Sequence, residues 1–275
     1  MTEKTSDKTS DVGFARAVVV GAGTMGHGIA QVTAMAGVVT TLVDLEQGMV
    51  DAGLSKIRAN LDKGIARGKV SEAERDETMG RLDGSTARDA LAEADLLIEA
   101  IPEKMPLKTE LFADADARMP DGAVLATNTS SLPVTEIAAA TARPEAVVGM
   151  HFFNPVHIMK LLEVVRGAAT SDETVDRVRA YAEVTGKTAV VVNDAPGFAT
   201  SRLGITLGNE AMRMVEEGVA SPADIDQAMK LGYGHPMGPL ALSDLVGLDV
   251  RLSITTFLHD EIGSDGFRAP RIMRK

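Results

Sequence analysis

The sequence contains no cysteine and no tryptophan, and aromatic residues make up only 3% of its 275 residues. Without cysteine there is no disulfide, no thiolate metal site and no cysteine nucleophile, and we predict no metal centre of any other kind. A reducing compartment suits this composition, and we expect the cytoplasm. No apolar run reaches the roughly 18 residues that a membrane-spanning helix needs, so no membrane association is expected.

Basic residues are also in short supply. The chain has 28 Lys and Arg against 39 Asp and Glu, which gives a formal net charge of −11. This balance argues against a nucleic-acid partner, because binding a phosphate backbone needs a surplus of basic side chains. The first thirteen residues, MTEKTSDKTSDVG, are polar and lack the apolar stretch of a signal peptide, so residues 1–13 are expected to form a flexible tail.

Short runs rich in β-branched residues alternate with helical patterns as far as residue 197. The predicted strands are Ala15–Val20, Val38–Val43, Asp95–Ala100, Ala123–Thr127, Val147–Phe152, Leu161–Val165 and Thr188–Val192. Helical connections favour parallel pairing, so residues 14–197 are predicted to form an α/β domain with a doubly wound, Rossmann-type sheet. From Phe198 onward only helical patterns remain, and residues 198–275 are predicted to form a smaller all-helical domain.

The stretch VVVGAGTMGHGIA places Gly21, Gly23 and Gly26 in G-x-G-x-x-G spacing, with Thr24 and Met25 between the last two glycines. The spacing alone is a weak signal, but here it follows a predicted strand and opens a predicted helix. In that context the glycines permit a tight turn, a close approach to a pyrophosphate and close packing of helix on strand. The loop is therefore predicted to bind a dinucleotide.

Asp44 ends the second predicted strand, where a carboxylate can accept hydrogen bonds from the adenosine ribose. No basic residue follows until Lys56, so nothing nearby would neutralise a 2′-phosphate. The sequence therefore favours NAD over NADP.

The stretch HFFNP begins with His151, a residue type whose pKa suits it to accept the proton of an alcohol. Glu163 lies downstream within the apolar run LLEVV, where an unpaired carboxylate would be costly to bury. If the intervening residues form a loop between two strands, the two side chains can face each other. The alternative interpretations are an ordinary strand end with an Asn-Pro turn, and a surface charge on an edge strand.

The polar stretch ATNTSSLPVTEI follows another predicted strand, at the edge of the sheet where α/β proteins bind ligands. Asn128 is a candidate cofactor contact, and Ser130 or Ser131 is a candidate contact to substrate or nicotinamide. Residues 128–131 could equally cap the following helix, and both interpretations can hold together.

Five motifs, GAGTMGHGIA, NTSSLPVTEIA, HFFNPVHIMKLLEVV, APGFATSRL and MKLGYGHPMGPLALSDLVGLD, together resemble the 3-hydroxyacyl-CoA dehydrogenases, in particular their bacterial 3-hydroxybutyryl-CoA type. The resemblance extends from Arg16 to Lys275. It implies the reaction (S)-3-hydroxyacyl-CoA + NAD⁺ ⇌ 3-oxoacyl-CoA + NADH, as in fatty acid β-oxidation. By position it implies that His151 is the catalytic base, that Glu163 orients it and that Ser130 contacts substrate and nicotinamide. It also implies cofactor contacts by Asn154, Glu103 and Lys108.

Two departures from the family pattern stand out. Ser201 replaces an asparagine that the family usually has near the substrate thioester, in GF-x-x-N-R. Because a hydroxyl is shorter and reaches substrate through water, we expect Ser201 to weaken activity without abolishing it. The family also continues with a basic, glycine-rich segment beyond Lys275, so the C-terminal end is expected to be short.

Basic residues outnumber acidic ones between Met49 and Val70, and Lys56 and Lys63 are seven residues apart on one helical face. This face is a candidate site for the CoA phosphates, although an ordinary solvated face explains it equally well. Extensive apolar patterns after Phe198 predict a homodimer through the helical domain. Two alternative functions are a dehydrogenase of a free hydroxy acid and a non-catalytic NAD-binding relative.

Overall fold

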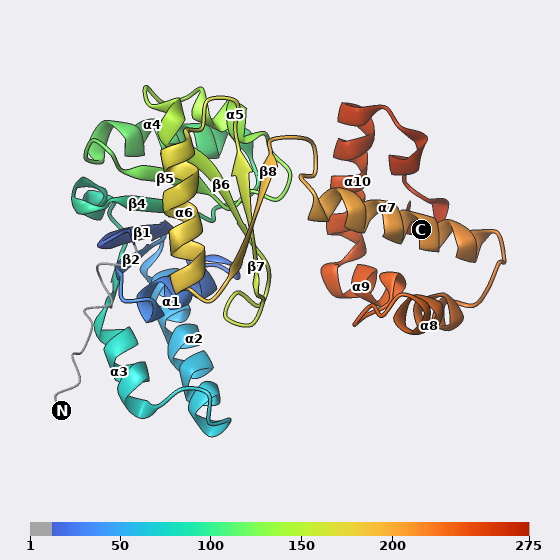
Figure 1. Cartoon of the computed structure of the whole chain (residues 1–275), viewed down its shortest axis with the longest axis horizontal. Helices are drawn as coiled ribbons and strands as arrows, with labels where there is room; N and C mark the ends of the chain where they lie inside the picture. Colours follow the sequence, from blue (N-terminus) through green and yellow to red (C-terminus); the bar gives the residue numbers. More distant parts are fainter. Residues whose placement is uncertain (1–12, 275) are drawn as a thin grey trace. The chain divides into compact units, whose positions relative to one another are not determined.

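The computed structural model describes residues 13–274, so most of the predicted N-terminal tail, residues 1–12, lies outside the described part. The chain divides into two compact units (Figure 1). Residues 13–129 and Pro133–Asp194 form the first, called here the sheet unit. Ser130–Leu132 and residues 195–274 form the second, called here the helical unit.

The sheet unit contains one eight-stranded sheet in the order β3-β2-β1-β4-β5-β6-β7-β8. The strands are β1 Arg16–Val20, β2 Val39–Val43, β3 Leu82–Ser85, β4 Leu96–Glu99, β5 Val124–Thr127, β6 Val147–Phe152, β7 Leu161–Arg166 and β8 Thr188–Asn193. All neighbouring pairs are parallel except β6 and β7, which are antiparallel because a short loop without a crossover helix joins them. The predicted α/β, Rossmann-type fold is confirmed.

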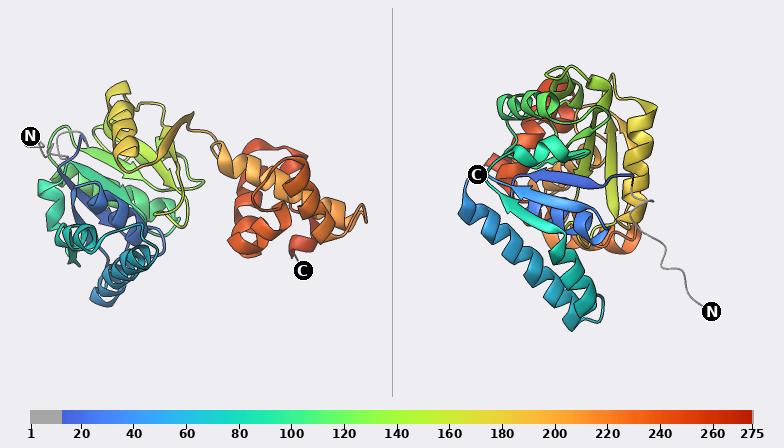
Figure 2. Two further views of the ribbon diagram at one scale, coloured as in Figure 1. Left: turned by 60° about the horizontal axis from the view of Figure 1, so that its bottom comes forward. Right: turned by 90° about the vertical axis from the view of Figure 1, so that its left-hand side faces the viewer.

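Helices cover both faces of this sheet. They are α1 Gly26–Met35, α2 Gln47–Ala66, α3 Glu72–Gly80, α4 Met105–Arg118, α5 Val134–Ala138 and α6 Asp172–Val184. Residues of α1, α2 and α6, among them Ile29, Leu61 and Val178, share one hydrophobic core with the strands. The right-hand view of Figure 2 shows α4 and α6 on opposite sides of the sheet, and α2 and α3 running side by side away from it.

One strand was not expected from the sequence. β3 has the sequence LDGS, and its Asp83 and Gly84 are residue types that strands usually avoid. It pairs only with β2, at the edge of the sheet, so tertiary pairing rather than local propensity makes it a strand. The helix that precedes it, α3, begins with a capping box in which Ser71 and Glu74 bond each other's backbone N–H groups.

The helical unit contains no strand among its described residues. Its elements are α7 Thr200–Glu216, α8 Pro222–Gly232, α9 Pro239–Val246 and α10 Leu248–Ile262, followed by the 3₁₀ turns η4 Asp265–Phe267 and η5 Arg271–Arg274. Ile205, Leu258 and Phe267 form a small core within it. Across residues 13–274, no helix has both the length and the apolar character that crossing a membrane would require.

Candidate active site

The glycine loop after β1 has the geometry that its sequence predicts. Gly21 has φ +104°, and a Cβ there would lie 2.5 Å from the carbonyl oxygen of Ala100. At Gly26 a Cβ would lie 1.6 Å from the carbonyl oxygen of Gly21, so only glycine lets α1 begin this close to the strand. Around the Cβ position of Gly23, apart from its own chain neighbours, no atom of residues 13–274 lies within 4 Å, which leaves the backbone open to a ligand.

Asp44 stands beside this loop at the end of β2. Its two carboxylate oxygens accept hydrogen bonds from the backbone N–H groups of Ala22 and Leu45, both at 2.7 Å. These bonds fix the carboxylate and leave further lone pairs for ribose hydroxyls. Helix α1 begins with no side-chain cap at Met25, so its N-terminal end suits an anionic group. The residues present therefore fit a dinucleotide.

His151 and Glu163 are directly opposite each other in the antiparallel pair of β6 and β7. The distance from His151 Nδ1 to Glu163 Oε2 is 2.7 Å, and the two residues are 6% and 0% exposed. Because β8 pairs with the far side of β7, Glu163 lies on an interior strand and is not the edge-strand surface charge of the alternative interpretation. A carboxylate held against Nδ1 fixes the tautomer and the orientation of the imidazole.

The two phenylalanines of HFFNP have different surroundings. The ring of Phe153 lies against that of His151, with centroids 4.4 Å apart. Phe152 is buried on the other side of the strand, where it meets Tyr181 edge to face. Only one of the two rings therefore contacts the imidazole, as the alternation of side chains along a strand requires.

Asn128 follows β5 and ties it to the next strand, because its Oδ1 accepts a hydrogen bond of 2.9 Å from the backbone N–H of Phe152. The capping position of α5 is occupied by Pro133, which lies outside residues 128–131. Asn128 is therefore better explained as a support for the end of β6, directly after His151, than as a helix cap.

Glu103 and Lys108 belong to a buried polar network at the ends of β4 and β5. The Lys108 ammonium lies 2.6 and 2.8 Å from the two carboxylate oxygens of Glu99 and 3.1 Å from Glu103. Thr127 donates to Glu99 at 2.7 Å, and Thr129 donates to Glu103 at 2.5 Å. Since Ser130 follows Thr129 in the chain, the network also fixes the backbone that leads into Ser130.

Lys108 is 1% exposed, so its charge is directed into this network. The family resemblance implies a cofactor contact by Lys108, but in the structure the main partner of Lys108 is Glu99, which is 0% exposed. The signal was present, because Glu99 ends the apolar run LLIE in the same way that Glu163 interrupts LLEVV. Glu103 is the more exposed member of the network, with 36% of its side chain accessible.

Basic residues from three segments gather near the loop between β6 and β7. Burial, together with the nearby basic groups of His27, Lys187 and Lys63, lowers the pKa of His157 on this loop. Lys63 belongs to α2, as does Lys56, and both lysines are exposed. Ser201 is half-buried in the first turn of α7, in the helical unit.

Family comparisons agree with this geometry. The profile described as 3-hydroxyacyl-CoA dehydrogenase, NAD binding domain, matches residues 16–195, and the profile of the C-terminal domain of the same family matches residues 197–275. The chain belongs to the 3-hydroxyacyl-CoA dehydrogenase family. This result confirms the resemblance seen in the sequence and the prediction of NAD as cofactor.

Individual relatives are similar over nearly their whole length. A probable 3-hydroxybutyryl-CoA dehydrogenase of Bacillus subtilis is 49% identical over 258 residues, which cover 94% of this chain and 90% of the relative. A 3-hydroxybutyryl-CoA dehydrogenase of Mycobacterium tuberculosis is 42% identical over 260 residues, covering 94% and 91%. The crystal structure of (S)-3-hydroxybutyryl-CoA dehydrogenase from Ralstonia eutropha matches with a TM-score of 0.91 at 40% identity, covering 95% and 92%. The chain is therefore an NAD-dependent oxidoreductase of this family.

Proposed function

We propose that this protein interconverts (S)-3-hydroxybutyryl-CoA and acetoacetyl-CoA, with His151 as general base and Glu163 as its orienting partner. The buried contact of 2.7 Å between His151 Nδ1 and Glu163 Oε2 is the observation that carries the proposal. The names of the relatives from B. subtilis, M. tuberculosis and R. eutropha support the choice of substrate.

The proton transfer follows from the position of the carboxylate. When Glu163 accepts the Nδ1–H of neutral His151, the acceptor nitrogen of the ring is Nε2. Nε2 then takes the hydroxyl proton of the substrate, and Glu163 stabilises the imidazolium that forms. Phe153 lies against the ring and shields it from water on that side. In the reverse direction the same imidazolium returns the proton to the 3-oxo group.

NAD⁺, when bound, supplies the acceptor for the hydride that leaves carbon 3. The chain's own contribution is positioning. Asp44 would accept hydrogen bonds from the ribose hydroxyls, and Glu103 would contact the cofactor. Asn154 would lie beside the nicotinamide, and Ser130 would contact both substrate and nicotinamide. Lys108 would act by fixing Glu103, since its ammonium lies 3.1 Å from that carboxylate.

The CoA phosphates would bind beside α2, at Lys56 and Lys63. Lys63 and Lys187 lie close enough to His157 to lower its pKa, so basic side chains gather in this region of an otherwise acidic protein, which supports the assignment. Reversing the charge of both lysines with Lys56→Glu and Lys63→Glu should raise the KM for acetoacetyl-CoA while the KM for NADH stays constant. An unchanged KM for the CoA ester would rule the assignment out.

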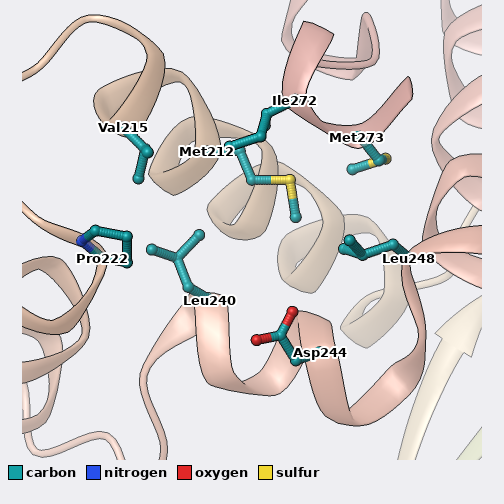
Figure 3. Close-up of a pocket in the computed structure, with 8 residues that line it drawn as sticks. All are labelled: Met212, Val215, Pro222, Leu240, Asp244, Leu248, Ile272 and Met273. Carbon is teal, nitrogen blue, oxygen red and sulfur yellow. The ribbon is translucent and has the colours of Figure 1, made fainter. Parts of the chain in front are cut away.

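A homodimer through the helical unit is also proposed. Large apolar side chains are exposed there, among them Leu231 (77%), Tyr233 (79%) and Leu245 (71%). The helical unit also contains a hollow of about 180 Å³, lined mainly by apolar groups of α7, α8, α9, α10 and η5 (Figure 3). Leu245→Glu should reduce the mass in solution to that of a monomer, whereas Leu45→Glu, at an 84% exposed site of the sheet unit, should not.

One assay separates the candidate functions. NADH oxidation is followed by absorbance with acetoacetyl-CoA, with acetoacetate and without substrate. Turnover with acetoacetyl-CoA alone supports the proposal, turnover with acetoacetate points to a dehydrogenase of free hydroxy acids, and no turnover points to a non-catalytic relative. The same assay tests the substrate role of Ser201. Ser201→Asn should raise or preserve kcat/KM for acetoacetyl-CoA, and a fall would contradict that role.

A further inference from the structure

The loop of residues 153–160 joins β6 to β7 and therefore joins the strand of His151 to the strand of Glu163. It also carries Asn154, which is exposed. Other side chains of the loop are exposed as well, including Ile158 at 57% and Met159 at 40%. An exposed loop of this kind needs an anchor if it is to hold one conformation beside a reacting centre.

Lys187 provides such an anchor. It is 8% exposed and stands just before β8, and its ammonium donates to the carbonyl oxygens of Val156 at 2.7 Å and Met159 at 2.9 Å. The backbone N–H of Thr188 donates to the carbonyl oxygen of Lys160 at 2.6 Å, which fixes the end of the loop beside the lysine. One side chain thus holds the first half and the second half of the loop together.

The anchored segment also contacts the helix that follows the glycine loop. Val156 is 2% exposed, and a Cβ at Gly28 of α1 would lie 2.9 Å from its Cβ. Glycine at 28 therefore lets the loop approach the first turns of α1, the helix whose N-terminal end fits the pyrophosphate. If Val156 moved, this packing would be lost, and the position of Asn154, two residues earlier in the loop, would change.

Burying the Lys187 ammonium costs free energy, because the charged group loses its hydration. Burial, followed by the charge of Lys160, lowers the pKa of Lys187 to about 8. Its hydrogen-bond partners are backbone carbonyls, and the ring of Phe152 lies 5.7 Å from its nitrogen. A methionine would fill the same space without this desolvation cost.

We propose that Lys187 is a positioning residue for hydride transfer, whose ammonium fixes loop 153–160, and with it Asn154, against helix α1. The inference rests on the proposed function, since it assigns Asn154 to the nicotinamide half of the cofactor. A positioning role has a different consequence from a purely stabilising one. Without the anchor the loop is loosened and misplaces a contact to the reacting groups, while the fold stays intact.

The test compares Lys187→Met with Lys187→Arg, using the exposed Lys230→Met on α8 as control. In the reduction of acetoacetyl-CoA, Lys187→Met should lower kcat about tenfold and raise the KM for NADH, with the KM for acetoacetyl-CoA within about twofold of wild type. Lys187→Arg should restore most of kcat, and Lys230→Met should match wild type. Should Lys187→Met fail to fold, Lys187→Gln replaces it in the same series.

Hydrogen exchange gives a readout that does not depend on the reaction. The amides of Ile158 and Met159 donate to the carbonyl oxygen of Pro155 at 2.9 and 3.0 Å, and they should exchange faster in Lys187→Met. An unchanged kcat, or a loss of kcat that arginine does not restore, overturns the proposal. If wild type itself does not turn over acetoacetyl-CoA, the proposed function fails, and unaltered exchange would then separately reject the anchor.

Discussion

The sheet unit and the helical unit differ in how they treat buried charge. In the sheet unit Lys108 is matched by Glu99, and His151 is matched by Glu163, all within hydrogen-bond distance. In the helical unit Arg251 is 4% exposed, yet it donates one hydrogen bond, of 2.8 Å, to the carbonyl oxygen of Gly204. Its Nε makes no hydrogen bond with the residues that the structure describes, and burial lowers the pKa of its guanidinium.

The two units also differ in the size of their hydrophobic cores. The sheet unit buries its apolar residues in a core that runs from β1 and α1 to α6. In the helical unit the core is small, and side chains as large as Tyr233 and Leu245 remain exposed. Large apolar side chains are exposed in both units, as Leu45 shows in the sheet unit, but the small core of the helical unit fits the homodimer proposed through it. The proposed active site lies in the sheet unit, so we expect it to depend on pairings within one chain, such as His151 with Glu163.

The most severe test of this comparison is Lys108→Met. The substitution leaves the Glu99 carboxylate buried without its cation, although Thr127 and the N–H of Ile101 still donate to it. Removing one partner of a buried ion pair costs about 3–5 kcal/mol, so the free energy of unfolding should fall by that amount in urea titrations. Lys104→Met, at a neighbouring exposed position, serves as control. A loss below about 1 kcal/mol would mean that the sheet unit does not depend on this pairing.

Glu163→Gln tests the second pairing through activity. Glutamine keeps the size of the side chain but cannot stabilise an imidazolium, so kcat should fall by about 10²–10³ while NADH binding is retained. Asp172→Asn alters a carboxylate whose side chain is 86% exposed, and it should leave kcat unchanged. Equal rates for wild type and Glu163→Gln would remove the carboxylate from the mechanism.

Lys187 is an intermediate case, a buried cation that is bonded to carbonyls. Because its folded-state pKa lies near 8, below its ordinary value of 10.5, the unfolded chain binds more protons between these values. Stability contributed by Lys187 is therefore complete above about pH 10.5 and is lost as the pH falls through about 8. The difference in unfolding free energy between wild type and Lys187→Met should rise across this window by up to about 3 kcal/mol. A flat difference would show that the buried ammonium is not perturbed.

Much of the sheet unit was predictable because its signals are local. Three kinds of residue show a physical requirement directly in the sequence: glycines on either side of a turn, a carboxylate at a strand end and a charge within an apolar run. His151 and Glu163 were predicted together on that basis, since burying LLEVV would leave the carboxylate in need of a partner.

The remaining features depend on contacts between distant segments. β3 forms because β2 pairs with it, and the sequence LDGS gives no sign of this. Lys187 follows a helix and a glycine, as many surface lysines do, and only the fold brings Val156 and Met159 above its ammonium. The cofactor contact of Lys108 is an expectation from the family resemblance. The contact between Lys108 and Glu99 follows from the arrangement of β4 and α4, so the sequence does not predict it.

Arg251→Met should have the smallest effect, and it tests the helical unit alone. The guanidinium enters where Gly208 leaves room, since a Cβ at that glycine would lie 2.0 Å from Nη2. Methionine would lose one hydrogen bond to Gly204 but would also remove a buried charge that lacks a carboxylate, so unfolding free energy should change by less than about 1 kcal/mol or rise. Lys108→Met and Arg251→Met are measured side by side at one protein concentration. A large loss for Arg251→Met that deepens as the protein is concentrated would show that a second chain supplies the missing anion.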